Sequence, residues 1–299
     1  MRRGSGRDAW APQTDGRGPR LGHPIRSSRS SSALAIRLGR GDWTRLGRCD
    51  SARTFGLGRA ILAAVRTRAI LFDLDDTLFD HWRCTREALE ALQGVYPAFR
   101  RWSLEAFVAR HSLWLERYHV DVLAGRLSVD EARLNRFSRL LTEAGEAPAL
   151  ETAARVAADY REAYVAAWRT VPGALELLEA LHPHAPIGII SNNVVGEQLE
   201  KIRVCGLEPY LDTIVISEEA GVAKPDPRIF SIALARIGCE AGEAVMVGDA
   251  WENDVVGARA AGIRAVWFNR FDAATPGASD VEQLRSFEPA DEVVDLLLG

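Results

Sequence analysis

Five short apolar segments, separated by stretches of helical character, constrain the fold of this chain more than any other feature. They cover residues 69–72, 186–190, 213–216, 244–247 and 265–268. Each is apolar at successive positions, which is typical of strands that are buried on both faces. Helices are expected at residues 173–181, 195–204, 226–237 and 255–261. Strands that alternate with helices predict an α/β fold, with a Rossmann-like parallel sheet and helices on both faces.

The interval from residue 81 to residue 170 breaks this alternation. It contains no convincing strand, and its apolar and aromatic residues recur at helical spacing. Ser128 and Glu131 have the spacing of a capping box at the start of one of these helices. We predict an all-helical cap domain over residues 81–170, inserted after the first strand. Residues 67–80 and 171–299 then form the α/β core, and the cap can act as a lid over the first strand's end.

Residues 1–66 differ from the rest in composition. They contain 14 arginines, no lysine and four acidic residues, all of them aspartate. Their Gly, Ser and Arg content and their lack of periodicity predict a disordered basic leader. Three interpretations are open: an organellar transit peptide, a nucleic-acid-binding tail, or translated leader upstream of a true start at Val65. The last is favoured because the folded domain is expected to begin within a few residues of Val65.

Charge and cysteine content limit the class of protein. Residues 67–299 contain 23 basic and 37 acidic residues, so binding of nucleic acid to this part is not expected. No apolar run approaches the roughly 18 residues that a membrane-spanning helix needs. The four cysteines are scattered, at Cys49, Cys84, Cys205 and Cys239. Free thiols in a reducing, cytoplasmic compartment are therefore expected, and the sequence does not indicate an oligomeric state.

Polar residues follow the predicted strands where the carboxyl ends of a parallel sheet would meet. They are Asp73, Asp75, Ser191, Asn192, Lys224, Asp249 and Asp254. Any one of them could be a turn former or a helix cap. Because ligand sites of open α/β sheets lie at this edge, the whole set predicts a site for a phosphate beside a divalent cation. Lys224 is one of only two lysines, the other being Lys201. A position that keeps Lys in so Arg-rich a chain needs a compact point charge.

In these motifs the chain resembles the haloacid dehalogenase-like hydrolases, in the phosphatase branch (subfamily I) with a helical cap of type C1. The resemblance extends from about residue 68 to the C-terminus. The matching motifs, in order, are Asp73-Leu-Asp75-Asp-Thr77, Ile189-Ile-Ser191-Asn192, Lys224-Pro-Asp-Pro, and Gly248-Asp249 with Asp254.

The resemblance implies a role for each residue. Asp73 is expected to be the nucleophile, and Asp75 the acid for the leaving group and then the base for water. Mg²⁺ would be held by Asp73, the backbone carbonyl of Asp75, and Asp249. Phosphate oxygens would be bound by Ser191, Asn192 (through its backbone N–H) and Lys224. Asp254 and Thr77 are expected in supporting roles, and Asp76 and Asp80 in structural ones.

These roles predict a Mg²⁺-dependent phosphatase that hydrolyses a small phosphomonoester, a nucleotide or sugar phosphate, through an aspartyl-phosphate. One alternative is a phosphosugar mutase of the same fold. Another, a 2-haloacid dehalogenase, is disfavoured by Asp75, which the dehalogenating members lack. A non-enzymatic binding module is disfavoured by the intact motifs. The motifs do not identify the substrate. His81, Trp82 and Arg83 could face the pocket, or lie in the cap's core or on its outer surface.

Overall fold

The computed structural model describes residues 67–277 and 280–299. The predicted leader, residues 1–66, lies outside the described residues together with Cys49, and so its interpretation stays a prediction. Cys84, Cys205 and Cys239 are free thiols. Within the described part of the chain, no helix combines the length and the apolar character needed to cross a membrane.

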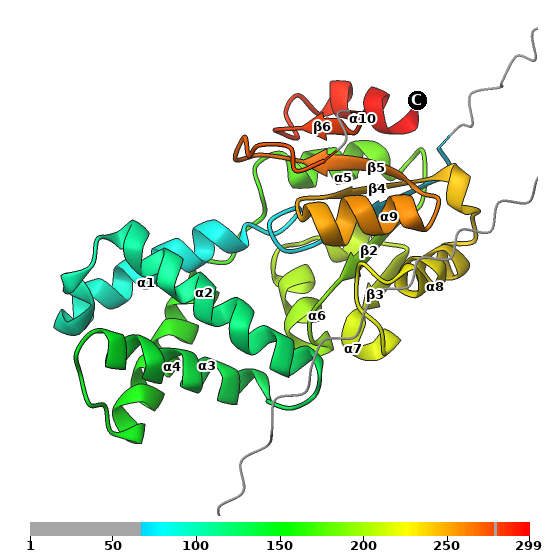
Figure 1. Ribbon diagram of the computed structural model, residues 1–299. Coiled ribbons are helices and arrows are strands. Elements are labelled where there is room, and N and C mark those ends of the chain that lie inside the picture. The colour runs from blue at the N-terminus through cyan, green and yellow to red at the C-terminus, as the bar shows by residue number, and fades with distance from the viewer. Residues whose placement is uncertain (1–66, 278–279) are drawn as a thin grey trace, which may run out of the picture. The chain divides into compact units, whose positions relative to one another are not determined.

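A six-stranded parallel sheet, with strand order β3-β2-β1-β4-β5-β6, forms the centre of the core (Figure 1). The strands are β1 (Ala69–Phe72), β2 (Ile187–Ser191), β3 (Thr213–Ile216), β4 (Ala244–Gly248), β5 (Arg264–Phe268) and β6 (Glu282–Leu284). The five predicted strands are confirmed to within a residue at each end. The sixth was not predicted, because its sequence, EQL, is polar and it lies exposed at the sheet edge.

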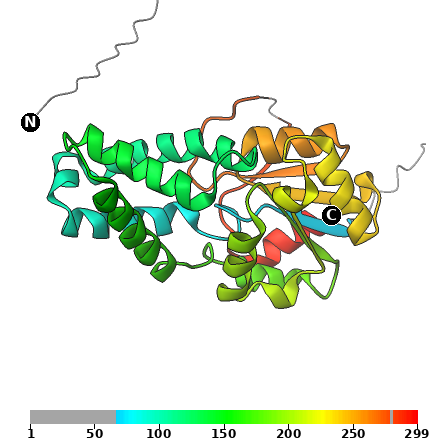
Figure 2. The ribbon, with the colours of Figure 1, turned by 90° about the horizontal axis from the view of Figure 1, so that it is seen from below.

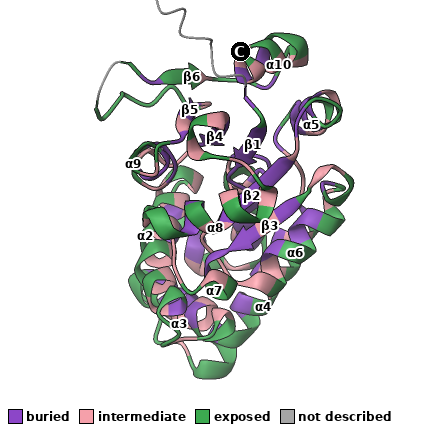
Figure 3. Ribbon diagram, turned by 90° about the vertical axis from the view of Figure 1, so that its right-hand side faces the viewer, coloured by how far each residue is buried: buried purple, intermediate pink, exposed green. Residues whose placement is uncertain are grey.

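Helices cover both faces of this sheet, as predicted. In β1, Ile70 and Phe72 belong to one apolar cluster, whereas Ala69 and Leu71 belong to the other. The first cluster includes residues of α5 (Ala174–Leu181), α6 (Val195–Val204) and α10 (Ala290–Leu298). The second includes residues of α8 (Pro227–Ile237) and α9 (Gly257–Ala260). Figure 3 shows the strands β1 and β2 as buried, with exposed residues on the outer sides of the helices. Burial on both faces explains the continuous apolar runs.

Four helices form the predicted cap between β1 and α5. They are α1 (His81–Val95), α2 (Leu104–Leu123), α3 (Val129–Glu143) and α4 (Leu150–Ala166). The capping box of Ser128 and Glu131 opens α3 as predicted. Aromatic residues fill the centre, with the rings of Phe99 and Phe107 4.5 Å apart, and those of Phe137 and Tyr160 4.9 Å apart. The four helices lie to one side of the sheet in both views (Figures 1 and 2). The fold class, a Rossmann-like sheet with a helical cap after its first strand, is confirmed.

Shorter helical segments complete the chain. They are η1 (Pro97–Arg101), η2 (Glu208–Tyr210), α7 (Ser217–Ala220), η3 (Ala241–Glu243) and η4 (Trp251–Val256). The segment η4 is a π-helical turn that leads directly into α9. The helix predicted from residue 255 therefore starts earlier, at Trp251, and Asp254 lies inside that turn and not at its start.

Two crossings of the chain connect the cap to the core. The amide of Val171 donates to the carbonyl of Leu78 (2.9 Å), and that of Asp80 donates to the carbonyl of Arg169 (3.1 Å). The side chain of Asp80 caps α1 by accepting from the Arg83 amide. Asp76, with a positive φ of 63°, accepts from the amide of Trp82. Asp76 and Asp80 thus have the structural roles that the sequence predicted.

Candidate functional site

The predicted site residues meet at the carboxyl edge of the sheet. Asp73 follows β1, Ser191 ends β2, and Asp249 follows β4. The strands β2 and β4 are the two neighbours of β1 in the sheet. A pocket of about 490 Å³ opens at this edge and is lined from both the core and the cap. Its lining includes all seven of the predicted polar residues: Asp73, Asp75, Ser191, Asn192, Lys224, Asp249 and Asp254. Thr77 is not part of the lining.

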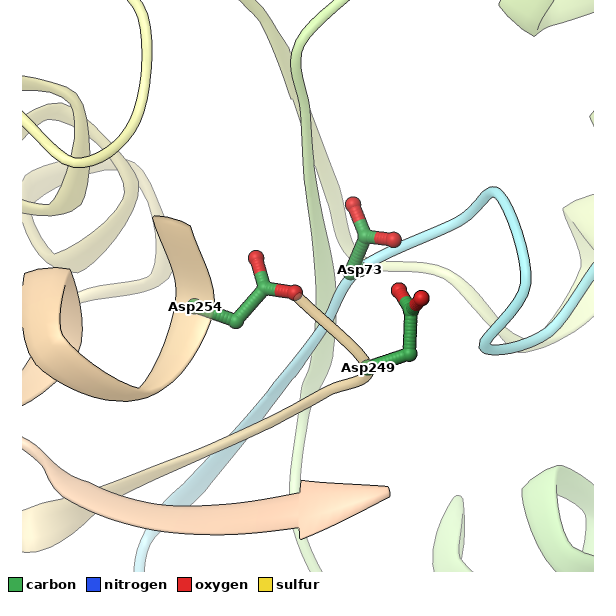
Figure 4. Close-up of side chains that lie close together, drawn as sticks. All are labelled: Asp73, Asp249 and Asp254. Carbon is green, nitrogen blue, oxygen red and sulfur yellow. The ribbon is translucent and has the colours of Figure 1, made fainter. Parts of the chain in front are cut away.

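Three carboxylates form the base of the pocket. One oxygen from each of Asp73, Asp249 and Asp254 lies within 4.8 Å of the other two, and Figure 4 shows the three side chains converging. Hard oxygen ligands of this kind are the ones that Mg²⁺ prefers. The residues therefore fit a divalent cation. Asp254, which was predicted in a supporting role, lies in this cluster. The side chain of Asp75 lies outside it and contacts Lys201.

Burial and crowding raise the pKa values of two of these carboxyls, those of Asp73 and Asp249. Burial raises the pKa of Asp249 to about 9, with the charges of Asp73 and Asp254 adding to the effect. Burial also raises the pKa of Asp73 to about 7, although Lys224 acts in the opposite direction. The protein's own cations thus do not offset three carboxylate charges, and in the metal-free protein bound protons do so instead. A bound cation would supply the missing positive charge.

Lys224 is the cation that the fold itself places among these carboxylates. Its Nζ donates to Asp73 (2.5 Å) and to Asp254 (2.6 Å), and only 2% of its side chain is exposed. Burial opposes its charge, but Asp254 and Asp73 hold its pKa above the ordinary value. The ammonium is therefore charged and fixed beside the Asp73 carboxylate.

The amide side chain of Asn192 holds the backbone of Lys224 in place. Its Nδ2 donates to the Lys224 carbonyl (2.8 Å), and its Oδ1 accepts from the Lys224 amide (2.7 Å). Both ends of the side chain are thereby occupied. The phosphate-binding role predicted for the backbone N–H of Asn192 is compatible with this use of its side chain.

Two further contacts support the acidic cluster. The hydroxyl of Thr77 accepts from the backbone amide of Asp249 (3.1 Å), which agrees with the supporting role predicted for Thr77. Asp254 accepts from the amide of Ala250 (2.9 Å). A Cβ atom on Gly248 would collide with the Asp254 carboxylate. The glycine before Asp249 is therefore needed for the close approach of Asp254.

Asp75 has its own cationic partner, which the sequence analysis did not assign to the site. Its carboxylate accepts from Lys201 Nζ (2.7 Å) and from Gln198 Nε2 (2.8 Å). Burial favours the neutral acid, but Lys201, followed by His81, holds the pKa of Asp75 below its ordinary value. Gln198 also donates to the hydroxyl of Ser191 (2.6 Å). The sequence contains one signal for Lys201, which is that only two lysines occur in this Arg-rich chain.

The three residues at the start of α1 separate in the structure. His81 lines the pocket, with its Nδ1 2.7 Å from the hydroxyl of Tyr164. Trp82 is 42% exposed and its ring lies 5.4 Å from that of Phe271. Arg83 is exposed and pairs with Glu87 on the same helix. Of the three candidates, only His81 reaches the pocket.

Contacts between the cap and the core hold the cap beside the pocket. His119 of α2 has its Nε2 3.2 Å from the carbonyl oxygen of Asn192. Arg133 of α3 and Arg161 of α4 approach Glu197 of α6, at 4.0 Å and 3.7 Å. Residues of the cap and of the core therefore line one pocket.

Comparison with known proteins agrees with this arrangement. Residues 67–262 match the family model described as haloacid dehalogenase-like hydrolase. The ribulose-1,5-bisphosphate 5-phosphatase of Halopiger xanaduensis is 32% identical over 77% of this chain and 98% of its own length. The phosphoserine phosphatase of Thermus thermophilus is 35% identical over 68% of this chain and 89% of its own length.

Solved structures share the fold as well. The HAD-hydrolase YfnB of Bacillus subtilis, solved with bound magnesium, is 26% identical. It aligns over 78% of this chain and 99% of its own, with a TM-score of 0.61. A 2-haloacid dehalogenase of Pseudomonas syringae is also 26% identical, over 77% of this chain and 99% of its own, with a TM-score of 0.52. The pocket geometry, the motifs and these relatives agree on one assignment: the chain belongs to the haloacid dehalogenase-like hydrolases.

Proposed function

We propose that this protein is a Mg²⁺-dependent phosphatase that hydrolyses a small phosphomonoester. The observation that carries the proposal is the placement of Lys224 between Asp73 and Asp254, inside an acidic pocket. A fixed ammonium beside a buried carboxylate suits the attack of that carboxylate on an anionic phosphoryl group. Uncatalysed hydrolysis of phosphate monoesters is among the slowest reactions known, so such groups must lower the barrier by about 20 kcal/mol or more.

Asp73 is the proposed nucleophile. Its carboxylate displaces the alcohol and forms an aspartyl-phosphate, which water then hydrolyses. Asp75 protonates the departing alkoxide and afterwards takes a proton from the attacking water. Lys224 and Ser191, with the backbone N–H of Asn192, bind the phosphoryl oxygens. Asp254 holds Lys224 in place.

A divalent cation would be held by Asp73, Asp249 and the backbone carbonyl of Asp75, with Asp254 close to the same position. When bound, Mg²⁺ neutralises the charge that develops between the carboxylate and the phosphoryl group. The crowding of three carboxylates within 4.8 Å supports this part of the proposal. The solved structure of YfnB with magnesium supports it independently.

The relatives favour phosphoryl chemistry over dehalogenation. Two proteins of at least 32% identity are named as phosphatases, acting on ribulose-1,5-bisphosphate and on phosphoserine. The 2-haloacid dehalogenase is similar at 26% identity. Asp75 favours phosphoryl chemistry, because loss of halide from carbon needs no acid for the leaving group. As part of the same proposal, we assign the enzyme to a reducing cytoplasm, and the free thiols of Cys84, Cys205 and Cys239 support this.

The direct test is hydrolysis of p-nitrophenyl phosphate. We expect turnover with Mg²⁺, its loss in EDTA, and a loss of at least about 10³-fold in kcat for Asp73→Asn. Asp295→Asn, an exposed change on α10, is the control and should leave kcat unchanged. Turnover that persists in EDTA or in Asp73→Asn would contradict the proposal.

Two further assays separate the rival enzymes. Chloride release from 2-chloropropionate without added metal, and no release of phosphate from esters, would identify a dehalogenase. Conversion of a hexose 1-phosphate into its 6-phosphate, without free phosphate, would identify a mutase.

A further inference from the structure

Arg136, on α3 of the cap, is a buried cation without a partner. It is 6% exposed, and no hydrogen bond or ion pair joins its guanidinium to any residue in the described ranges. Its Nε is fully buried without an acceptor. The guanidinium carbon lies over the rings of Phe137 and Tyr160, at 5.6 Å and 5.5 Å from their centroids. These rings hold the planar group in place, while its Nε is left without an acceptor and the residue lines the pocket.

A buried arginine in this condition is costly. Removing a charge from water is unfavourable unless the charge is paired. A neutral form offers no escape, because guanidinium keeps its proton under all ordinary conditions. Burial, assisted by the nearby charge of Arg133, does lower the pKa of Arg136 from its ordinary value. The fold therefore maintains a positive charge that its own residues do not neutralise.

The surrounding carboxylates do not supply the missing partner. Glu197 is shared by three other cations: Arg133 at 4.0 Å, Arg161 at 3.7 Å and Lys201 at 3.6 Å. Glu116, on α2, lines the same pocket but is exposed. The carboxylates that line this end of the pocket are thus exposed or engaged with other cations, and none of them pairs with Arg136.

The end of the pocket at Arg136 and the catalytic end at Asp73 belong to one cavity. Arg136 and Asp73 both line the pocket of about 490 Å³, a size typical of small-molecule sites. Lys224 and the proposed cation account for one anionic group at the core end. Arg136 is therefore available to bind a second anionic group at the cap end of the pocket.

We propose that the substrate is a phosphomonoester whose alcohol part carries a second anionic group, a carboxylate or a second phosphate, and that Arg136 binds this group. The inference rests on the proposed phosphatase function and narrows its substrate class. Both anions match the fork of N–H donors that guanidinium presents. Neutral phosphomonoesters would leave the guanidinium unpaired in the pocket, which disfavours their binding.

Matched substrates test the inference in the wild-type enzyme. We expect kcat/KM for 2-phosphoglycolate or 1,3-propanediol bisphosphate to exceed that for ethyl or propyl phosphate by about 10–100-fold. Whichever of the two anionic substrates is preferred identifies the second group. Equal kcat/KM for the anionic and the neutral substrates would overturn the inference and leave the phosphatase function standing.

Variants of Arg136 assign the preference to this side chain. Arg136→Met should reduce kcat/KM for the preferred anionic substrate to about that of its neutral partner. Hydrolysis of the neutral ester should not fall, because the unpaired guanidinium that opposes its binding has been removed. Arg136→Lys keeps the charge without the fork and should fall between the two. Arg139→Met, an exposed change on the same helix, should have no effect. A preference that survives Arg136→Met would overturn the assignment.

A binding measurement separates this inference from the function. In Asp73→Asn, calorimetry with 2-phosphoglycolate and 1,3-propanediol bisphosphate should show affinity for at least one of them that falls tenfold or more when Arg136→Met is added. Affinity that does not depend on Arg136 overturns the inference, whether or not the wild type is a phosphatase. If Arg136→Met does not fold, as judged from its Tm, the wild-type comparison of substrates decides.

Discussion

Both lysines of the chain end at a carboxylate in the pocket. Lys224 contacts Asp73 and Asp254, and Lys201 contacts Asp75. Each side chain is almost fully buried. A compact ammonium can fit between carboxylates where the wider guanidinium would need more room. The use of lysine at only these two positions therefore has a physical reason in the site.

The residues of the motifs were predictable, and those of the cap-side wall were not. Asp73, Asp75, Asp249 and Lys224 follow strands or precede a helix, so their meeting at one edge follows from the topology of a parallel sheet. Arg136 lies inside a helix of an insert. Its position in the pocket depends on how α3 packs against the neighbouring helices and on how the cap meets the core, and neither follows from spacing along the chain.

Lys201→Met tests the role of the second lysine at the level of single residues. Without the ammonium, the pKa of Asp75 should rise, and the acidic limb of the pH profile of kcat should move to higher pH. We expect kcat near neutral pH to fall about 10–100-fold, since general acid catalysis contributes about 10²–10⁴-fold. Arg203→Met, an exposed change on the same helix, is the matched control. An unchanged pH profile in Lys201→Met would show that Lys201 has only a packing role.

At the scale of elements, the two crossings between core and cap determine where the pocket's walls lie. Arg270, in the loop after β5, pairs with both Asp76 and Asp80 at 2.7 Å. Asp80 caps α1, and Asp76 lies in the turn that leads to it. One arginine therefore joins the sheet to the first helix of the cap. The sequence predicted structural roles for both aspartates but did not indicate this partner, which lies 190 residues or more away.

Other elements differed from expectation for local reasons. Strand β6 is short, polar and at the edge, so no apolar run indicates it. The π-helical turn at Trp251–Val256 starts before the predicted helix. This turn carries Asp254 back toward Lys224, a contact that regular helical periodicity does not predict.

Arg270→Met tests the junction. The change would leave Asp80, whose side chain is only 4% exposed, without its cation. We expect the free energy of unfolding to fall by about 2–4 kcal/mol, in the range for breaking a mostly buried ion pair. Urea denaturation measures this. Arg285→Met removes an exposed pair with Asp272 and should cost less than about 1 kcal/mol. Equal losses in the two variants would show that the junction has no special role.

At the scale of the whole molecule, charge is separated within one cavity. The core end has three carboxylates around Lys224, those of Asp73, Asp249 and Asp254, and the cap end has Arg136, whose Nε has no acceptor among the described residues. A cation at the first end and an anion at the second would balance both. The fold thus accepts local electrostatic strain at each end, and its stability in the absence of ligands should reflect that strain.

The acidic end makes the stability of the metal-free protein depend on pH. The folded-state pKa values of Asp73 and Asp249 are raised to about 7 and about 9, against an ordinary value of 3.8. The folded state therefore binds these protons more tightly than the unfolded chain does. The resulting stabilisation is complete below pH of about 4. It is lost as the pH rises through about 7 for Asp73 and about 9 for Asp249.

Mg²⁺ should oppose this loss, because it binds the ionised carboxylates of the folded state. In EDTA we expect the Tm to fall between pH 5 and pH 9 more steeply in the wild type than in Asp249→Asn. At 100 times its Kd, Mg²⁺ should raise the wild-type Tm at pH 8 by roughly 5–10 °C. The rise should be smaller at pH 5, where protons compete for the same oxygens, and small at both pH values in Asp249→Asn. Differential scanning fluorimetry provides each Tm, with Asp295→Asn as the control that keeps the wild-type response. An equal Mg²⁺ effect at pH 5 and pH 8, or one that survives Asp249→Asn, would show that the cation binds elsewhere than at the three carboxylates.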